Sequence, residues 1–220
     1  MNKTKNIKPW TNSFKAFFIL IVLFFISARV ETQNVLEKTI LANEIKSISI
    51  NGNQIFNITV ETSETDFIII KSTLDGEYQN QFQIVTEEVD NQLKLSLEQI
   101  AFTTIEDDKR NAHKVIAATL QLVIPEQCSL NVISDVGSVD LSGEFNELTI
   151  ELLQGYCTVL GTANSTIINT IDGDINVVTN SASINANSNN GIIDLDEFSI
   201  SNSIWKLKSI NGDITVAKQE

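Results

Sequence analysis

Six aspartates stand close to glycine turns in the C-terminal half of the chain, where carboxylates in a row would suit calcium. They are Asp135, Asp140, Asp172, Asp174, Asp194 and Asp213. Stacked turns would align four of them as an acidic turn row, namely Asp172, Asp174, Asp194 and Asp213. Calcium-binding β-rolls need Gly-Gly-x-Gly-x-Asp in each unit, and this chain has no Gly-Gly pair. Because aspartate also favours turns through bonds to its own backbone, the sequence predicts turn residues here ahead of a calcium site.

The two cysteines, Cys128 and Cys157, could form a disulfide or remain as two thiols. They are 29 residues apart, whereas partners in neighbouring coils of the repeat described below would be about 18 apart. Their repeat positions also differ, so we expect two small buried thiols, with a disulfide as the alternative. Two cysteines and one histidine without paired spacing are too few ligands for a zinc site.

The one histidine, His113, lies in the most charged loop of the chain, between Phe102 and Lys114. This loop also contains Glu106, Asp107, Asp108, Lys109 and Arg110. Acid–base chemistry would be sought here, but charge runs are usually solvated surface. A single histidine would have to serve any nucleophilic triad, and the chain has no Gly-x-Ser-x-Gly elbow. The sequence therefore predicts a protein that is not an enzyme, with no catalytic residues, no cofactor and no metal.

Repeated glycines organise the chain from Leu130 to Val216. Gly137, Gly155, Gly173 and Gly191 recur at every eighteenth position, and Gly212 follows at the twenty-first. Apolar side chains fall at fixed offsets from these glycines. Two residues after them come Val139, Cys157, Ile175, Ile193 and Ile214, and four after come Leu141, Val159, Val177, Leu195 and Val216. Seven before come Leu130, Leu148, Thr166, Ile184 and Trp205, and five before come Val132, Ile150, Ile168, Ala186 and Leu207. A period near 20 residues with apolar columns is typical of a solenoid.

Each repeat predicts two short strands joined by a glycine turn. Asp172, Asn190 and Asn211 precede their glycines, and such pairs favour positive φ at low steric cost. Residues alternate between apolar and polar after the glycine, so each strand has one apolar face. Neighbouring coils stacked about 4.8 Å apart would bury these faces and pair their backbones in parallel. We therefore expect an all-β fold, a single-stranded right-handed β-helix with rungs of about 18 residues.

The two ends of this array need protection, because an open end presents unpaired strands. The coil around Ser181–Asn190 carries Ala182 and Ala186 in place of larger groups, so we expect it to be the least stable. Its asparagines could form ladders of stacked amides. Lys206, Lys208 and Lys218 follow it in the sequence, and we expect these lysines to guard the last coil.

Residues 1–28 read as an export signal. An unbroken apolar run from Ala16 to Ile26 follows four lysines, Lys3, Lys5, Lys8 and Lys15, and Ser27-Ala28 offers a cleavage site. The run is shorter than the roughly 20 residues of a membrane-spanning helix, although an uncleaved anchor stays open as the alternative. Removing the segment with its four lysines would change the net charge from −13 to −17. Such a charge argues against nucleic acid and anionic lipid surfaces as direct partners, so a membrane would be reached only through this segment.

Residues 29–125 are β-rich but lack the glycine period. Ile48 with Ile50, and Phe56 with Ile58 and Val60, alternate as half-buried strands do. The same alternation continues in later segments, such as Leu93-Leu95-Leu97 and Leu120-Leu122-Ile124. Turn signals such as Asn51-Gly52 and Asp75-Gly76 separate the expected strands. We expect irregular first coils of the solenoid, or a β cap on its end, followed by regular rungs over residues 126–220.

The pattern resembles the putative-adhesin domain family of bacterial envelope proteins, a Bacteroidetes-type family related to the head GIN adhesin-like domain. The resemblance rests on Val123-Ile124-Pro125-Glu126 leading into Leu130-Asn131-Val132, on Gly137-Ser138-Val139, Gly143-Glu144-Phe145 and Gly155-Tyr156-Cys157, and on Thr170-Ile171-Asp172-Gly173-Asp174-Ile175 and Ser209-Ile210-Asn211-Gly212-Asp213-Ile214. It covers most of the chain after the signal and implies a right-handed β-helix in the envelope. No catalytic residues accompany it.

These observations predict an exported, non-enzymatic β-solenoid that acts as an adhesin or as a binding scaffold at the cell envelope. Its partner would be an envelope or extracellular ligand, either a polysaccharide or a protein. It would work in the periplasm, on the outer membrane surface or outside the cell. Two alternatives remain, a carbohydrate-active β-helix enzyme and a periplasmic accessory of an envelope-stress system.

Overall fold

The computed structural model describes residues 34–76, 79–100, 117–180, 182–199 and 201–219. The predicted signal segment and the charged loop around His113 lie outside these residues. The strands are β1 (Asn34–Leu41), β2 (Ser47–Asn51), β3 (Ile55–Ser63), β4 (Phe67–Asp75), β5 (Phe82–Val89), β6 (Gln92–Gln99), β7 (Ala117–Pro125), β8 (Cys128–Val136), β9 (Ser138–Gln154), β10 (Cys157–Asp172), β11 (Ile175–Thr179), β12 (Ser183–Ser188), β13 (Ile193–Leu195), β14 (Ile204–Ser209) and β15 (Ile214–Lys218). A 3₁₀ turn, η1 (Gln79–Gln81), lies between β4 and β5. The expectation of an all-β fold is confirmed.

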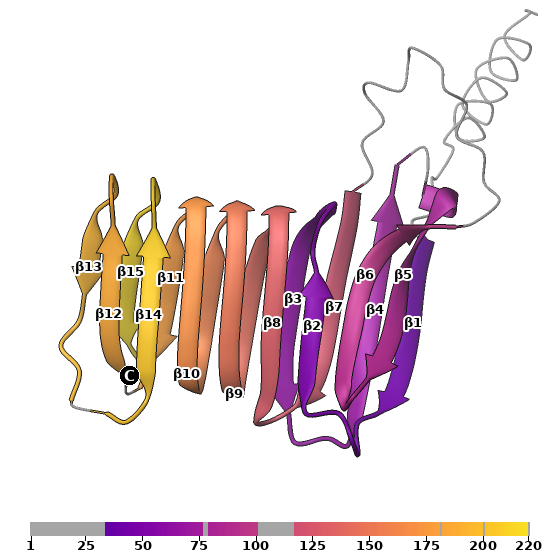
Figure 1. The fold of residues 1–220 in the computed structure, drawn as a ribbon, viewed down its shortest axis with the longest axis horizontal. Coiled ribbons are helices and arrows are strands. Elements are labelled where there is room, and N and C mark those ends of the chain that lie inside the picture. Colours follow the sequence, from indigo (N-terminus) through magenta and orange to yellow (C-terminus); the bar gives the residue numbers. More distant parts are fainter. Residues whose placement is uncertain (1–33, 77–78, 101–116, 181, 200, 220) are drawn as a thin grey trace, which may run out of the picture. The chain divides into compact units, whose positions relative to one another are not determined.

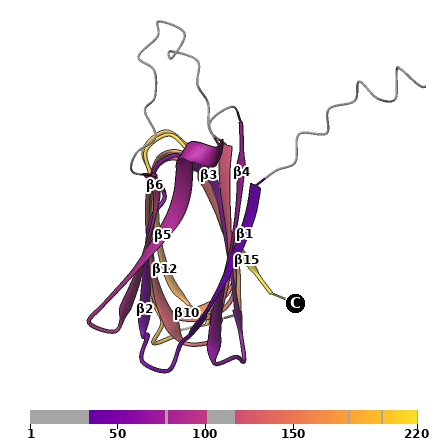
Figure 2. The ribbon, with the colours of Figure 1, turned by 90° about the vertical axis from the view of Figure 1, so that its right-hand side faces the viewer.

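All 15 strands belong to one sheet that runs as two facing walls through the compact unit Asn34–Glu220 (Figures 1 and 2). The first wall has the order β1-β4-β7-β3-β9-β10-β11-β15-β13. The second has β5-β6-β2-β8-β9-β10-β14-β12. The long strands β9 and β10 contribute to both walls. The first part of β9 pairs with β3 and its second part with β8, while the first part of β10 pairs with β11 and its second part with β14. The apolar core lies between the walls.

Parallel pairing between equivalent repeat positions joins the central coils. Cys157 of β10 pairs with Val139 of β9 on one side and with Ile175 of β11 on the other. Residues that lie 18 positions apart in the sequence are therefore neighbours across this ladder. Val139, Cys157 and Ile175 are fully buried, as expected for the column two residues after each glycine.

The last repeats stack in an order that differs from their order in the sequence. Trp205 of β14 pairs with Thr166 of β10 and, on its other side, with Ile184 of β12. In the first wall β15 likewise lies between β11 and β13. The coil around Gly212 is thus inserted between the coils around Gly173 and Gly191, and the coil around Gly191 ends the array. A strict sequence order of rungs is therefore wrong for the last two coils.

This insertion also corrects the expectation for the lysines. Lys206, Lys208 and Lys218 belong to the penultimate coil, so they do not guard the last one. The end coil is less buried than the others, with Ile193 41% and Leu195 40% exposed. Both occupy columns that are buried in every coil further inside. The reason is that no further coil within the described residues covers them.

The N-terminal part supplies another coil and an antiparallel end. β2 and β3 pair in parallel with β8 and β9, and they bury Ile48, Ile50, Ile58 and Val60. Beyond them β4 pairs antiparallel with both β1 and β7, and β5 pairs antiparallel with β6. At this end Lys38 donates a hydrogen bond to Thr86 Oγ1, which links β1 to β5 across the walls. A charge on an edge strand discourages pairing with other chains. No helix within the described ranges is long and apolar enough to cross a membrane.

Candidate functional site

The repeat glycines form a stacked column at one edge of the walls. A Cβ placed on Gly155 would lie 2.2 Å from the carbonyl oxygen of Gly137, and one on Gly173 would lie 1.8 Å from that of Gly155. The same contact recurs at 2.0 Å from Gly212 to Gly173 and at 2.1 Å from Gly191 to Gly212. No side chain fits at such distances, so the glycines are required for close stacking of the turns. A structural role for these glycines stays a prediction, and the close stacking of their turns is consistent with it.

Hydroxyl groups three residues before the glycines hold these turns from inside. Ser209 Oγ accepts a hydrogen bond from Gly212 N at 2.8 Å and donates to Gly173 O at 3.2 Å. Ser188 repeats the pattern in the end coil, accepting from Gly191 N and donating to Gly212 O. Both hydroxyls satisfy backbone groups that would otherwise be buried without a partner. They are occupied, so they do not supply nucleophiles.

The predicted acidic turn row is used mainly by the backbone of the next coil. Asp174 Oδ1 accepts from Asp213 N at 2.9 Å, and Asp213 Oδ1 accepts from Ile192 N at 2.7 Å. Asp172 accepts from the amide of Asn211, whose own Oδ1 accepts from Asn190 at 2.7 Å. Asp194 lies apart from them in β13, opposite Thr215. The structure thus brings three of the four residues, Asp172, Asp174 and Asp213, into turn ladders, meaning rows of hydrogen bonds that run from one turn to the next.

No group of three or more histidine, cysteine, aspartate or glutamate side chains in the described part of the chain is arranged to hold a metal ion. Of the asparagines in the coil around Ser181–Asn190, Asn190 forms an amide bond of the expected kind, to Asn211. Another ladder runs from Asn164 to Asn146 and on to Ser129 Oγ. Polar side chains on the turns therefore stabilise stacking between coils.

The two cysteines are separate buried thiols. Burial raises the pKa of Cys157 to about 12, and the nearby Asp140 carboxylate adds to this shift. Burial also raises the pKa of Cys128 to about 11, against the effect of its bond to the Ser129 backbone. Thiols with pKa values this high are poor nucleophiles at neutral pH. They contribute packing, as expected.

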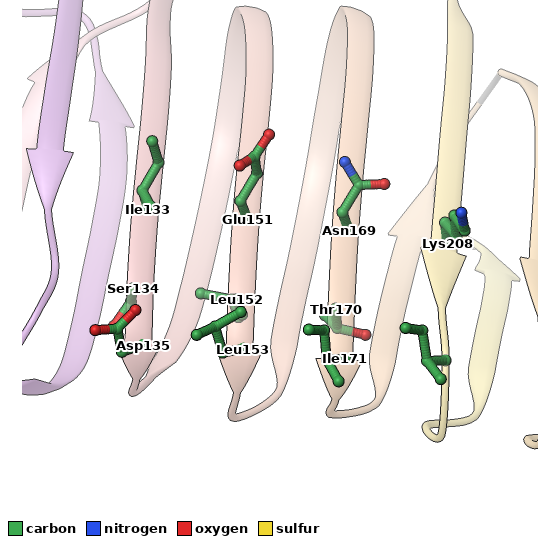
Figure 3. Close-up of a pocket in the computed structure, with 11 residues that line it drawn as sticks. Ile133, Ser134, Asp135, Glu151, Leu152, Leu153, Asn169, Thr170, Ile171 and Lys208 are labelled. Carbon is green, nitrogen blue, oxygen red and sulfur yellow. The ribbon is translucent and has the colours of Figure 1, made fainter.

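A groove on the outer surface of the second wall is the candidate binding site (Figure 3). It has a volume of about 420 Å³ and crosses β8, β9, β10 and the end of β14. Its outward side chains stand in two rows, one residue per coil. The row four residues before each glycine position is Ile133, Glu151, Asn169 and Lys208, and the row two residues before is Asp135, Leu153, Ile171 and Ile210.

Exposed aliphatic groups line this groove. Leu153 and Ile133 are each 47% exposed, and Ile171 is 39% exposed, although each lies on an outward face. Register places them on adjacent strands, since Leu152 pairs with Thr170 and Ser134 pairs with Leu152. None of the groove-lining residues is aromatic. A contiguous apolar surface edged by charges is a common mark of a binding site.

Sequence reasoning did not identify this groove. Its signal is present in the column two residues before the glycines, where the aliphatic residues Leu153, Ile171 and Ile210 recur at outward positions. The glycine period identifies the inward columns directly, whereas outward columns become informative only when the order of the coils is known. Because Lys208 follows Asn169 in space, and not Asn187, the basic end of the groove could not be placed from the sequence.

Two other hollows offer weaker sites. One of about 510 Å³ lies against β2, β5 and β6 and is lined mostly by polar side chains such as Ser49, Asn51 and Lys94. Another of about 370 Å³ lies between the β3–β4 and β7–β8 turns, where Glu64, Asp66 and Glu126 gather. An acidic gathering at turns is expected of solvated surface in a chain of net charge −13.

No model of a known protein family matches the chain, and no curated protein sequence matches it. Solved structures do. A structure from Clostridium sporogenes, described as a putative cell adhesion protein, superposes with a TM-score of 0.61 at 13% identity, covering 86% of this chain and all of that one. A structure from Bacteroides fragilis, described as a putative adhesin, has a TM-score of 0.39 at 13% identity and covers 86% of this chain and 98% of its own. A structure from Parabacteroides distasonis, described as a putative lipid binding protein, has a TM-score of 0.31 at 14% identity and covers 85% of this chain and 97% of its own. At these identities the first likeness concerns the fold alone, and the other two superpose too loosely to add to it.

Proposed function

We propose that the chain is an exported, non-enzymatic β-solenoid that binds a ligand at the cell envelope, as an adhesin or as a binding scaffold. The observation that carries this proposal is the groove of outward side chains repeated from coil to coil across β8, β9, β10 and β14. Stacked rungs give a rigid surface, and rigidity lowers the entropy lost when an extended ligand binds.

The finer description of the fold belongs to this proposal. We infer a right-handed β-helix whose regular rung has about 18 residues, a length close to that of known solenoid repeats. The coiling is inferred from β9 and β10, which pass from one wall to the other while residues 18 apart stay paired. The right hand is inferred from the general rule for connections between parallel strands of one sheet. The relation to the head GIN adhesin-like domain is proposed on the same glycine turns. The fold likeness to the Clostridium sporogenes structure, described as a putative cell adhesion protein, supports adhesion as the class of function.

A carbohydrate-active enzyme is the alternative that the groove makes worth testing. Asp135 and Glu151 both line it, and two carboxylates are the usual equipment of a glycosidase. Sugar rings, however, generally stack on aromatic side chains, and the exposed aromatic residues Phe56, Phe67 and Tyr156 lie outside the groove lining. We therefore place binding ahead of hydrolysis.

Protease shaving of intact cells tests the proposed location. Release of peptides from Val35 onward, with a periplasmic control protein intact, would place the solenoid outside the cell. Protection that is lost when the outer membrane is opened would place it in the periplasm and remove the adhesin half of the proposal. Recovery of the full-length chain in the cytoplasmic fraction would contradict export altogether.

A further inference from the structure

The chemistry of the groove identifies a class of ligand, and this inference rests on the proposed binding function. Leu153, Ile171 and Ile210 occupy the same repeat position in three successive coils, and Ile133 extends the apolar surface into the coil before them. Coils are spaced by about 4.8 Å, so four of them give an aliphatic surface roughly 14 Å long. It crosses the strands and does not follow them.

An extended peptide fits this surface poorly. Side chains on one side of an extended chain recur about every 6.6–6.8 Å, which does not match a spacing of about 4.8 Å between coils. The backbone offers no alternative attachment here, since the strands under the groove are paired on both sides. Addition of a peptide strand needs a free sheet edge.

A flexible alkyl chain has neither restriction, because it presents no repeating polar groups and so needs no register. Aliphatic side chains bury methylene groups without directional bonds. The volume of about 420 Å³ lies within the usual range for small-molecule sites. Sugars are disfavoured for the reason given above, the absence of an aromatic side chain from the groove lining.

Charges at the two ends of the groove give the ligand a direction. Lys208 lies in the coil of Ile210, between Asn169 on one neighbouring strand and Asn187 on the other. Asp135 and Glu151 lie at the opposite end, in the coils of Ile133 and Leu153 (Figure 3). An anionic head group is attracted to the first end and repelled from the second.

We propose that this groove binds a single-chain carboxylate amphiphile of the fatty-acid class, with its alkyl chain along Leu153, Ile171 and Ile210 and its carboxylate at Lys208. The net negative charge of the rest of the protein acts only weakly on the head group, because exposed charges more than a Debye length away, about 8 Å at physiological ionic strength, are largely screened.

Equilibrium dialysis of the full-length chain against labelled dodecanoate, below the concentration at which it forms micelles, tests the proposal. We expect saturable binding of one equivalent. The double variant Leu153→Asp with Ile171→Asp should bind at least tenfold more weakly. Leu160→Asp is the matched control, since Leu160 is also 47% exposed but lies outside the groove lining, and it should bind as the wild type does.

The head group is tested with Lys208→Glu and with dodecyltrimethylammonium as a cationic ligand of equal chain length. The wild type should prefer dodecanoate at least tenfold, and the variant should lose or reverse this preference. Equal binding by the groove variants, or no saturable binding by the wild type, would overturn the proposal. So would binding to phosphatidylglycerol vesicles without binding to monomeric dodecanoate.

The outcome is separable from that of the proposed function. A chain that shaving places outside the cell but that does not bind dodecanoate keeps its envelope function and loses only this ligand. A chain that binds dodecanoate but fractionates with the cytoplasm keeps the ligand and loses the envelope function.

Discussion

Gly212 stacks directly on Gly173, although Gly191 lies between them in the sequence. A Cβ on Gly212 would lie 2.0 Å from the carbonyl oxygen of Gly173, while Gly191 stacks on the far side of Gly212. Following the chain, the coil after β11 is the end coil, formed by β12 and β13. The next coil, formed by β14 and β15, lies between the end coil and the coil of β11. Closing this arrangement requires the glycine column to be continuous.

Gly173→Ala should destabilise the solenoid strongly. Its new Cβ would meet the Gly155 carbonyl, which is backbone and cannot move aside without separating two coils. We expect a loss of about 3 kcal/mol or more in the free energy of unfolding, at the upper end of overpacking effects, measured by denaturant titration. Gly52→Ala is the matched control, because the atoms nearest to its new Cβ belong to side chains and not to backbone, namely Ile58 Cδ1 at 2.8 Å and Ser134 Cβ at 3.0 Å. An equal loss in both variants would show that the stacked column has no special demand for glycine.

The inserted coil should determine the stability of the end coil. Within the described residues, β14 is the strand that pairs with β12, and Trp205 of β14 is fully buried with its Nε1–H donating to Ala163 O at 3.1 Å. Trp205→Ala should cost about 3–5 kcal/mol and abolish hydrogen-exchange protection in β12 and β13 before any change in β2. Trp205→Phe keeps most of the apolar volume and should preserve that protection. Loss of protection in β2 first would contradict the stacking order. The expectation that the end coil is the least stable remains a prediction, which the same exchange experiment tests.

Much of the core could be predicted from the sequence because apolar columns at fixed offsets report which residues share a stack. These columns place Cys157 and Trp205 in the core, and both are buried. The order of the coils could not be predicted. The regular glycine interval of 18 residues and the interval of 21 before Gly212 are each long enough for one coil, and neither length says which coil it stacks against. The groove depends on that order through Lys208. The proposed boundary at residue 125 remains a prediction, although β2 and β3 stack on β8 and β9 across it.

Asp213→Ala should be more damaging than Asp194→Ala. Asp213 Oδ1 accepts a hydrogen bond from Ile192 N at 2.7 Å, whereas Asp194 stands on the outward side of β13. Loss of a charged hydrogen bond costs about 1.5–3 kcal/mol, while an exposed substitution usually costs no more than about 0.5 kcal/mol. Asp213→Asn retains an acceptor oxygen, so its loss of stability should lie between those of Asp213→Ala and Asp194→Ala. Thermal unfolding of the three variants tests this ranking, and an equal effect of Asp194→Ala would exclude the turn-ladder role.

Calcium should leave the protein unchanged, because two of the four row carboxylates already bond to backbone N–H groups and a third bonds to an amide. We expect the same melting temperature with millimolar calcium chloride and with a chelator. A ligand that binds only the folded state raises stability in proportion to the logarithm of its concentration over Kd. A melting temperature that rises steadily with calcium would therefore restore the calcium interpretation of the acidic turn row.

The buried thiols make stability depend on alkaline pH. The pKa of Cys157 is raised to about 12 and that of Cys128 to about 11, from an ordinary value of 9.0. Both thiols therefore stay neutral in the folded protein at a pH where the unfolded chain ionises. Their contribution is complete below about pH 9 and is lost as pH rises toward the folded values, by roughly 1.4 kcal/mol per thiol for each pH unit. The free energy of unfolding should fall more steeply between about pH 9 and pH 10.5 in the wild type than in Cys128→Ala with Cys157→Ala. The double variant removes the thiols and retains every lysine and tyrosine, so parallel curves for the two proteins would show that the thiols do not carry this dependence.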